Sequence, residues 1–331
     1  WQDAAVSEVA NAPPAVGRPS VYSLAAGDQR VIYRGTLGHL HELARVNADS
    51  AAGDWRHTDI TVEMKIPAAG CDPTAVVFQG VPHIVYVDHN QRGREIWFDG
   101  QWRQHPLPAA PLPASEVAIS KTNERLYVTY RTRFGNPCEL TLNSSPLESK
   151  RIWTPRLIKR LPSQGRPIAF NPADRRYVIF RATEKWPVRQ PFLFHHILRD
   201  LKVDRPPNAL LRSSDVGDSF WRLEPIGTPP SQVAGDPCVI HDAKQELYFL
   251  AYRDIAGHIQ EAAATGEAWP VTDPTELAGA PVAAGEPAGL VSAASGSRYY
   301  VYRGTDGHLH ELHFDGSWTH RDLTAAAVAA P

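Results

Sequence analysis

The two ends of this 331-residue chain carry nearly the same phrase. Residues 33–43 read YRGTLGHLHEL and residues 302–312 read YRGTDGHLHEL. A tryptophan and a polar stretch follow each phrase, at Trp55 and Trp318. An internal repeat with a period of about 50 residues is typical of proteins built as an array of similar units. The repeat therefore constrains the architecture more strongly than any other feature of the sequence.

Weaker copies of the unit lie between these two. Each copy has an aromatic anchor at the end of a β-branched or aromatic run, and the six anchors are Tyr33, Tyr86, Tyr130, Phe180, Tyr252 and Tyr302. Runs of this kind, bounded by Gly, Pro, Asn and Asp, predict strands. Every unit is expected to hold four of them: an apolar strand after a Gly/Pro signal, the anchor strand, a strand after a turn, and a strand opened by tryptophan.

Four-stranded antiparallel units at this period are the blades of β-propellers. We therefore predict an all-β fold, a single six-bladed β-propeller domain over residues 1–331. The blades are expected at about 15–62, 67–107, 112–157, 163–226, 231–277 and 281–325, the fourth with an insertion at about 182–207. A linear solenoid would need distinct capping units, whereas the first and last copies are the most alike. Trp1 and the linker after it leave a seven-bladed ring as the alternative.

The fourth unit contains a further motif. Residues 213–220 read SSDVGDSF, which fits the Asp-box pattern S-x-D-x-G-x-S-F. The pattern resembles the hairpin turn between the outer strands of sialidase-like propeller blades. Its Asp and Ser side chains would accept hydrogen bonds from turn amides, so we predict a structural role for it.

Composition excludes several classes of partner. A net charge of −2 gives no broad attraction to nucleic acid, and the apolar runs are too short for a membrane-spanning helix. The three cysteines have no evident partner and no metal-knuckle spacing, so we expect neither a metal nor a cofactor. The chain begins at Trp1 rather than Met, which suggests a processed or trimmed N-terminus and leaves a secreted protein as one option for the compartment.

Three polar or aromatic residue types recur around the predicted ring. Glutamate occupies one position of the third strand in five units, arginine follows the anchor, and tryptophan opens the fourth strand in all six. The candidate ligand-binding residues are Glu42, Glu95, Glu139, Glu261, Glu311, Arg34, Arg131, Arg253, Arg303, Trp55, Trp102, Trp153, Trp221, Trp269 and Trp318. Aromatic faces stack on sugars, carboxylates and guanidinium groups bind hydroxyls, and repeated weak sites gain avidity. We predict a multivalent, non-catalytic, lectin-like binder of glycans. The structural alternative is that the tryptophans pack between blades and that Glu–Arg pairs bridge them.

The order of aromatic residue, turn, Gly, Glu, Asp-Gly and Trp resembles the fucose-binding lectin propellers of fungi and bacteria. The clearest stretches are residues 84–102 and 311–318. The resemblance implies that the five glutamates accept hydrogen bonds from sugar hydroxyls and that the six tryptophans line the neighbouring wall. That family also has an arginine two residues before the anchor. The matching positions here hold Val31, Ile84, Val128, Val178, Leu250 and Tyr300.

The first hairpin predicts how its side chains are oriented. A two-residue turn between Gly35 and Gly38 would set Val31 opposite Glu42 and Arg34 opposite His39. Alternation along the strands would then put Arg34 and Glu42 on different faces, so that they could meet only across neighbouring blades. The pairs His39/His41 and His308/His310 have i, i+2 spacing, which can chelate a metal, but the sequence offers no third ligand.

Two other functions remain open from the sequence. A propeller glycoside hydrolase or lyase would need a cluster of unlike groups that breaks the repeat. The candidates are Lys185, Arg189, His195, His196, Arg199 and Asp200 of the insertion and the inner-strand acids Asp72, Asp236 and Glu286. A protein-interaction platform would use the apolar residues of the same insertion, 182–207, which include Trp186 and Phe192-Leu193-Phe194.

Overall fold

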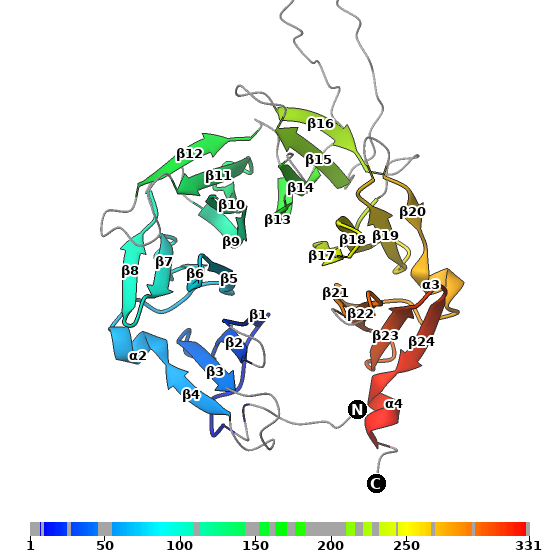
Figure 1. The fold of residues 1–331 in the computed structure, drawn as a ribbon, viewed down its shortest axis with the longest axis horizontal. Coiled ribbons are helices and arrows are strands. Elements are labelled where there is room, and N and C mark those ends of the chain that lie inside the picture. Colours follow the sequence, from blue (N-terminus) through cyan, green and yellow to red (C-terminus); the bar gives the residue numbers. More distant parts are fainter. Residues whose placement is uncertain are drawn as a thin grey trace, which may run out of the picture. The chain divides into compact units, whose positions relative to one another are not determined.

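The computed structural model describes residues 7, 10–24, 28–45, 55–108, 113–122, 124–142, 152–158, 163–170, 176–182, 210–215, 221–226, 232–242, 244–265, 269–292 and 295–328. Over these residues the strands form six four-stranded sheets (Figure 1). The strand orders are β1-β2-β3-β4, β5-β6-β7-β8, β9-β10-β11-β12, β13-β14-β15-β16, β17-β18-β19-β20 and β21-β22-β23-β24. The chain therefore pairs each strand with its neighbour in sequence, as the repeat predicts.

The chain divides into two compact units. The first consists of residues 1–161, 165–178 and 329–331. Its elements are β1 (Ser20–Tyr22), β2 (Gln29–Arg34), β3 (Leu40–Arg45), β4 (Arg56–Asp59), α2 (Ile60–Met64), β5 (Thr74–Phe78), β6 (Val81–Val87), β7 (Gly93–Phe98), β8 (Trp102–Pro106), β9 (Pro113–Lys121), β10 (Leu126–Thr132), β11 (Pro137–Leu142) and β12 (Trp153–Leu157). Most of β13 (Ser163–Phe170) belongs to this unit as well.

The second unit consists of residues 162–164 and 179–328. Its elements are β14 (Tyr177–Ala182), which begins in the first unit, β15 (Leu210–Asp215), β16 (Trp221–Pro225), β17 (Cys238–Asp242), β18 (Leu247–Arg253), β19 (Ile259–Ala263), β20 (Val271–Thr272), α3 (Pro274–Leu277), β21 (Ala288–Val291), β22 (Arg298–Arg303), β23 (Leu309–Phe314), β24 (Trp318–Asp322) and α4 (Leu323–Val328). Four of the outer strands begin at a predicted tryptophan: β8, β12, β16 and β24.

The aromatic anchors lie in the core between sheets. All six are at most 2 % exposed. Between β1–β4 and β5–β8, the apolar cluster includes Ile32, Leu40, Ile84 and Tyr86. Three of the tyrosine hydroxyls donate to a proline carbonyl in the segment before the first strand of their sheet: Tyr33 to Pro13 at 2.8 Å, Tyr86 to Pro67 at 3.2 Å and Tyr302 to Pro281 at 2.7 Å. The recurring aromatic residue thus fills the space between sheets and fixes the incoming loop.

The predicted register of the first hairpin is wrong by one residue. Glu42 pairs with Ile32 and Leu40 pairs with Arg34. The cause is a three-residue turn: the Gly35 N–H donates to the His39 carbonyl at 2.9 Å, and Gly38 adopts a φ of +79°. A left-handed glycine at the end of such a turn adds one residue relative to a two-residue hairpin. Arg34 and Glu42 therefore share one face of the hairpin.

Several predicted features are only partly covered by the described residues. Residues 183–209, which include nearly all of the insertion, lie outside them, as do Trp1 and residues 216–220 of the Asp-box pattern. The three cysteines form no disulfide. In the described part of the chain, no helix has the length and apolar character needed to cross a membrane.

A short Asp-x-Thr segment closes three of the sheets. It reads Asp59-Ile60-Thr61, Asp273-Pro274-Thr275 and Asp322-Leu323-Thr324. The aspartate caps the helix that follows, since Oδ1 accepts the backbone N–H three residues later at 2.8–2.9 Å. The threonine Oγ1 accepts the N–H of the residue that begins the third strand, at 2.8–2.9 Å. In each of these three sheets, the aspartate and threonine side chains therefore accept hydrogen bonds from backbone N–H groups that have no partner in the sheet or helix.

We predict that Thr275→Val lowers the free energy of unfolding by about 1–3 kcal/mol, because the buried Ile259 N–H loses its acceptor without a change in volume. Thr324→Val is the matched control and should cost less. The Thr324 hydroxyl accepts the N–H of the exposed Leu309, and water can replace it there. Urea denaturation measures both. Equal losses in the two variants would contradict this account of the corner.

Candidate functional site

The five recurrent glutamates are buried on their predicted strands. Glu42, Glu95, Glu139, Glu261 and Glu311 are between 0 and 6 % exposed. They lie on β3, β7, β11, β19 and β23, in each case on the third strand of a sheet. A carboxylate at this depth requires hydrogen-bond or ionic partners, so its contacts decide what it can do.

Two of the carboxylates are paired with an arginine of the following sheet. Arg298 binds Glu261 through two hydrogen bonds, Nε to Oε2 at 2.9 Å and Nη2 to Oε1 at 3.0 Å. Tyr300 adds a third, at 2.6 Å, and burial together with this carboxylate raises the pKa of its hydroxyl. Arg176 Nε lies 2.5 Å from Glu139 Oε2, and Nη2 of the same arginine donates to Ser120 Oγ at 3.2 Å. Both arginines stand four residues before the anchor of their sheet.

Two other carboxylates have a basic partner within their own sheet, and one of them also accepts a hydrogen bond from the following sheet. Glu42 accepts from the Tyr22 hydroxyl and lies 3.4 Å from Arg30 Nη1, and burial raises the pKa of that tyrosine. Glu95 lies 2.9 Å from His83 Nδ1 and accepts from Trp153 Nε1 at 3.0 Å. Arg30 and His83 stand three residues before their anchors. The resemblance to the lectin family drew attention to the position two residues before the anchor. The partners found here stand three or four residues before it.

These contacts give four glutamates a structural role between or within sheets. Glu311 differs, since its side chain has no hydrogen bond or ion pair with the residues that the structure describes. That the glutamates also contact a ligand stays a prediction.

The arginines that follow the anchors do not converge on these glutamates. Arg34 shares a face with Glu42 but binds Asp72 of the next sheet, with Nη2 3.0 Å from Oδ1. The same Asp72 accepts the Arg18 N–H at 2.8 Å, and Glu286 accepts the Asp236 N–H at 3.0 Å in the second unit. The carboxylates of Asp72 and Glu286, two of the inner-strand acids that we considered for catalysis, therefore link one sheet to the next.

The remaining predicted arginines have different surroundings. Arg253 donates to the Ala234 carbonyl at 3.4 Å, Arg131 is partly buried, and Arg303 is exposed. None of the three has an ion pair with a recurrent glutamate among the described contacts.

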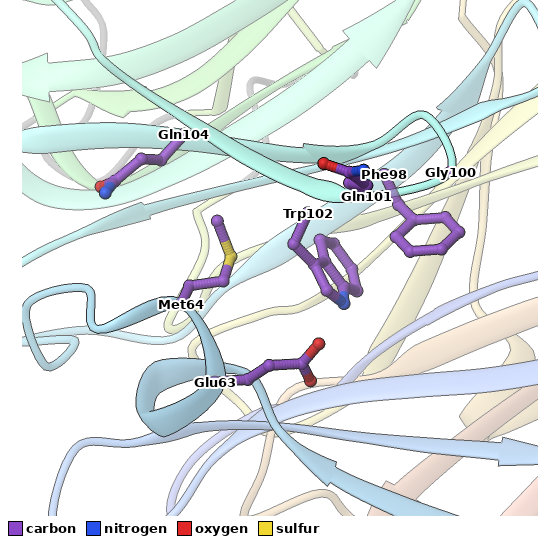
Figure 2. A pocket seen from close by; sticks show the side chains of 7 residues that line it. All are labelled: Glu63, Met64, Phe98, Gly100, Gln101, Trp102 and Gln104. Atoms are coloured by element: carbon purple, nitrogen blue, oxygen red, sulfur yellow. The ribbon is translucent and has the colours of Figure 1, made fainter.

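The tryptophans fall into distinct environments. Trp153 and Trp269 are 6 % exposed, and Trp318 stacks on Tyr300 with ring centroids 5.8 Å apart. Trp55 is partly buried, and the side chain of Trp221 lies outside the described residues. Trp102 lines a pocket (Figure 2).

The Trp102 pocket lies within the first unit and has a volume of about 420 Å³. Its lining residues are Glu63, Met64, Phe98, Gly100, Gln101, Trp102 and Gln104. Helix α2 supplies the first two, and the hairpin of β7 and β8 supplies the rest. Pockets that hold small molecules begin at about 300 Å³, so this one has room for a ligand of modest size.

The local sequence explains this geometry. Gly100, with a φ of +98°, permits the tight turn that pairs Phe98 with Trp102 across the hairpin. Their ring centroids are 5.2 Å apart at an interplanar angle of 62°. Asp59 caps α2, whose Glu63 carboxylate points toward the indole of Trp102 (Figure 2). An aromatic corner, one carboxylate and two amides therefore face the same space.

The second unit contains a matching hairpin with a different lining. Phe314 and Trp318 pair as Phe98 and Trp102 do, with centroids 5.1 Å apart. Counted from the capping aspartate, however, Leu277 and Ala278 of the second unit replace Glu63 and Met64. Sequence reasoning missed Glu63 because no repeated signal marks it. The second-unit hairpin therefore lacks a counterpart of the Glu63 carboxylate.

We predict that Arg298→Met lowers the free energy of unfolding by about 3–5 kcal/mol, because Glu261 would remain buried without its cation. Arg303 lies on the same strand and is exposed, so Arg303→Met should change the free energy of unfolding by no more than about 0.5 kcal/mol. Chemical denaturation compares the two. A double variant, Glu261→Gln with Arg298→Met, should recover part of the loss. An Arg298 variant as stable as the control would contradict the structural role of this pair.

Comparison with known proteins places the fold. No protein-family model matches the sequence, and no curated protein sequence matches it significantly.

Solved lectin structures do resemble it. BP39L from Burkholderia pseudomallei has a TM-score of 0.64 at 15 % identity, over 91 % of this chain and 82 % of that one. AofleA from Arthrobotrys oligospora gives 0.60 at 12 %, over 93 % and 87 %. The lectin of Aleuria aurantia gives 0.56 at 14 %, over 92 % and 94 %. The chain thus has the all-β propeller fold of these lectins, with four-stranded antiparallel blades.

Proposed function

We propose that this chain is a lectin-like, carbohydrate-binding propeller and that the Trp102 pocket is its principal sugar site. The observation that carries the proposal is the lining of this pocket, where aromatic faces, a carboxylate and amides converge. The predicted glycan partners follow from that chemistry.

Each group in the pocket matches a part of a sugar ring. The aromatic corner formed by the exposed Phe98 and the partly buried Trp102 suits the apolar face of a pyranose. The Glu63 carboxylate can accept hydrogen bonds from two neighbouring hydroxyls, and charge-assisted bonds of this kind are the stronger ones. Gln101 and Gln104 can both donate and accept.

The structural neighbours support the ligand class. The lectin of Aleuria aurantia has been solved with Fucα1-6GlcNAc and with α-methyl-L-fucoside, and SapL1 with α-methyl fucoside. The Aleuria lectin is described as six-bladed. We extend the proposal accordingly to a single six-bladed domain over residues 1–331, with the six four-stranded sheets as its blades.

We further propose that binding is non-catalytic and multivalent. Glu63 is the one carboxylate that lines the Trp102 pocket, whereas glycoside hydrolysis ordinarily uses two. The other tryptophan-bearing sheets would supply weaker sites, and repetition would raise the overall avidity.

A glycan array followed by calorimetry tests the site. For the best-bound sugar, Trp102→Ala and Glu63→Gln should each weaken binding by about tenfold or more, which corresponds to at least about 1.4 kcal/mol. Leu277→Gln, at the position of the second unit that corresponds to Glu63, is the matched control and should bind like the unaltered protein.

Two results would contradict the proposal. If the array shows no binding at any glycan density, the lectin function is wrong. If a sugar binds but the Trp102 and Glu63 variants retain full affinity, the site is elsewhere. Release of reducing sugar from a bound glycan would refute the non-catalytic part.

A further inference from the structure

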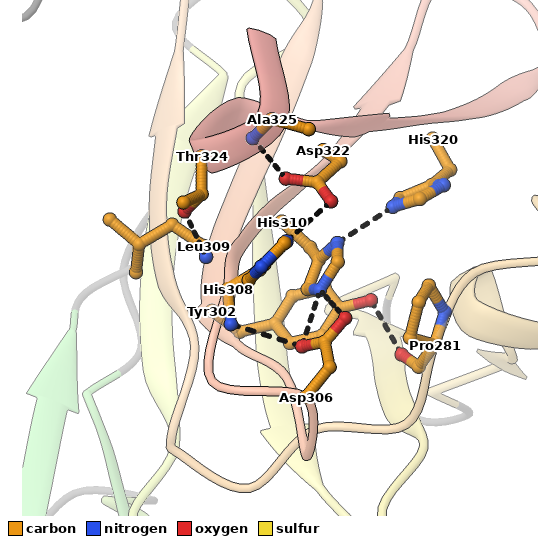
Figure 3. Close-up of polar contacts among 10 residues, drawn as sticks. All are labelled: Pro281, Tyr302, Asp306, His308, Leu309, His310, His320, Asp322, Thr324 and Ala325. Atoms are coloured by element: carbon orange, nitrogen blue, oxygen red, sulfur yellow. Dashed lines mark hydrogen bonds and ion pairs between the residues drawn. The ribbon is translucent and has the colours of Figure 1, made fainter. Parts of the chain in front are cut away.

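Five side chains of histidine and aspartate gather at one end of the last sheet (Figure 3). They are Asp306, His308, His310, His320 and Asp322. His308 Nδ1 lies 2.7 Å from Asp322 Oδ2, and His310 Nε2 lies 3.0 Å from Asp306 Oδ1. The second ring nitrogen of His310 lies 3.0 Å from His320 Nε2. The sequence pairs His308 with His310 but gives no hint that β24 brings further ligands to them.

Three of these side chains are arranged as metal ligands. One ligand atom each from Asp306, His308 and Asp322 lies within 4.8 Å of the other two. Zinc ligands at about 2.0–2.2 Å from the metal are separated by roughly 3.4 Å in a tetrahedron, so small side-chain movements suffice to close the set. Among the residues that the structure describes, this is the one group of its kind. The three side chains are exposed or partly exposed, so an ion can reach them.

The surrounding groups orient these ligands. The His308 N–H donates to Asp306 Oδ1 at 3.0 Å, and the Ala325 N–H donates to Asp322 Oδ1 at 2.8 Å. His310 is 1 % exposed and contacts the carboxylate of Asp306 from the protein side. Partners of this kind, which hold first ligands in place, accompany most metal sites in proteins.

The internal repeat provides a comparison within the chain. In the first sheet, His39 lies 2.8 Å from Asp59 and His41 lies 3.0 Å from His57, which reproduces the contacts of the last sheet. Leu37 there replaces Asp306. The fifth sheet keeps the His258–Asp273 contact at 2.7 Å, with Ala256 at that position. The histidine–aspartate bond is therefore a shared structural feature. A second carboxylate also lies beside the histidine of the fifth sheet, where Asp254 Oδ1 accepts the His258 N–H at 2.9 Å, but among the described residues the close set of three ligand atoms occurs in the last sheet.

We propose that Asp306, His308 and Asp322 bind a divalent transition-metal ion of the zinc class. One imidazole and two carboxylates form a ligand set that suits Zn²⁺, and a fourth position stays open to water or to a ligand. A metal ion between the side chains would replace the His308–Asp322 hydrogen bond with two coordinate bonds. The site is separate from the Trp102 pocket and does not depend on the proposed function.

Isothermal titration calorimetry with ZnCl₂ tests the site in the full chain. The unaltered protein should bind zinc at this site, and Asp306→Leu and His308→Gln should each weaken that binding at least about tenfold. His39→Gln, in the copy that lacks the third ligand, should leave it unchanged. Asp306 is exposed, so thermal melting of the Asp306 variant in EDTA should match that of the unaltered protein and show that its loss of zinc is not a loss of fold.

A gain-of-binding variant tests the deciding role of Asp306. Leu37 is 80 % exposed, and Leu37→Asp gives the first sheet the ligand set of the last. This variant should bind one more zinc ion per chain. The proposal is overturned if the unaltered protein binds no zinc, if Asp306→Leu binds it as tightly, or if Leu37→Asp adds no site. Zinc held by the cysteines or by the insertion would produce the second of these results.

Discussion

A carboxylate buried between packed sheets constrains much of this structure. Five of the six third strands carry a glutamate in their buried stretch, and a charge there is costly unless it is paired and hydrogen-bonded. The chain meets this requirement in two ways, with an arginine of the next sheet for Glu139 and Glu261 and with a partner in the same sheet for Glu42 and Glu95. The basic partner can come from the same sheet or from the next one. The repeat units therefore share the glutamate although the residues around it differ from unit to unit.

The two candidate sites are identified by residues that occur in one copy of the repeat, in contrast to the residues that recur in several copies. The Asp-x-Thr corner and its histidine contact recur in three sheets and serve the backbone. Glu63 and Asp306 do not recur, and neither is needed for the corner, since Leu277 and Leu37 stand in their places elsewhere. Polar residues that break a structural repeat are therefore the informative ones in this chain. Both occur beside features that the repeat already supplies, an aromatic hairpin in one case and a histidine pair in the other.

Much of the fold can be predicted from the sequence, because strands, turns and anchors have local signals. The tryptophans at the start of outer strands and the glutamates of third strands lie where the pattern puts them. The register of the first hairpin could not be predicted, since it depends on the φ angle of Gly38. The Glu261–Arg298 pair joins residues in different sheets, and no local pattern announces it. Glu63 was missed because α2, which positions it beside Trp102, is a single turn of helix after the fourth strand.

The crystal structure of the protein with its best-bound saccharide tests the central claim most directly. The account predicts a sugar ring whose apolar face lies against Trp102 or Phe98 and whose hydroxyls donate to Glu63. The side chains of Glu139 and Glu261 should keep their arginine partners in that complex. A sugar bound at one of these buried glutamates, with the Trp102 pocket empty, would contradict the account.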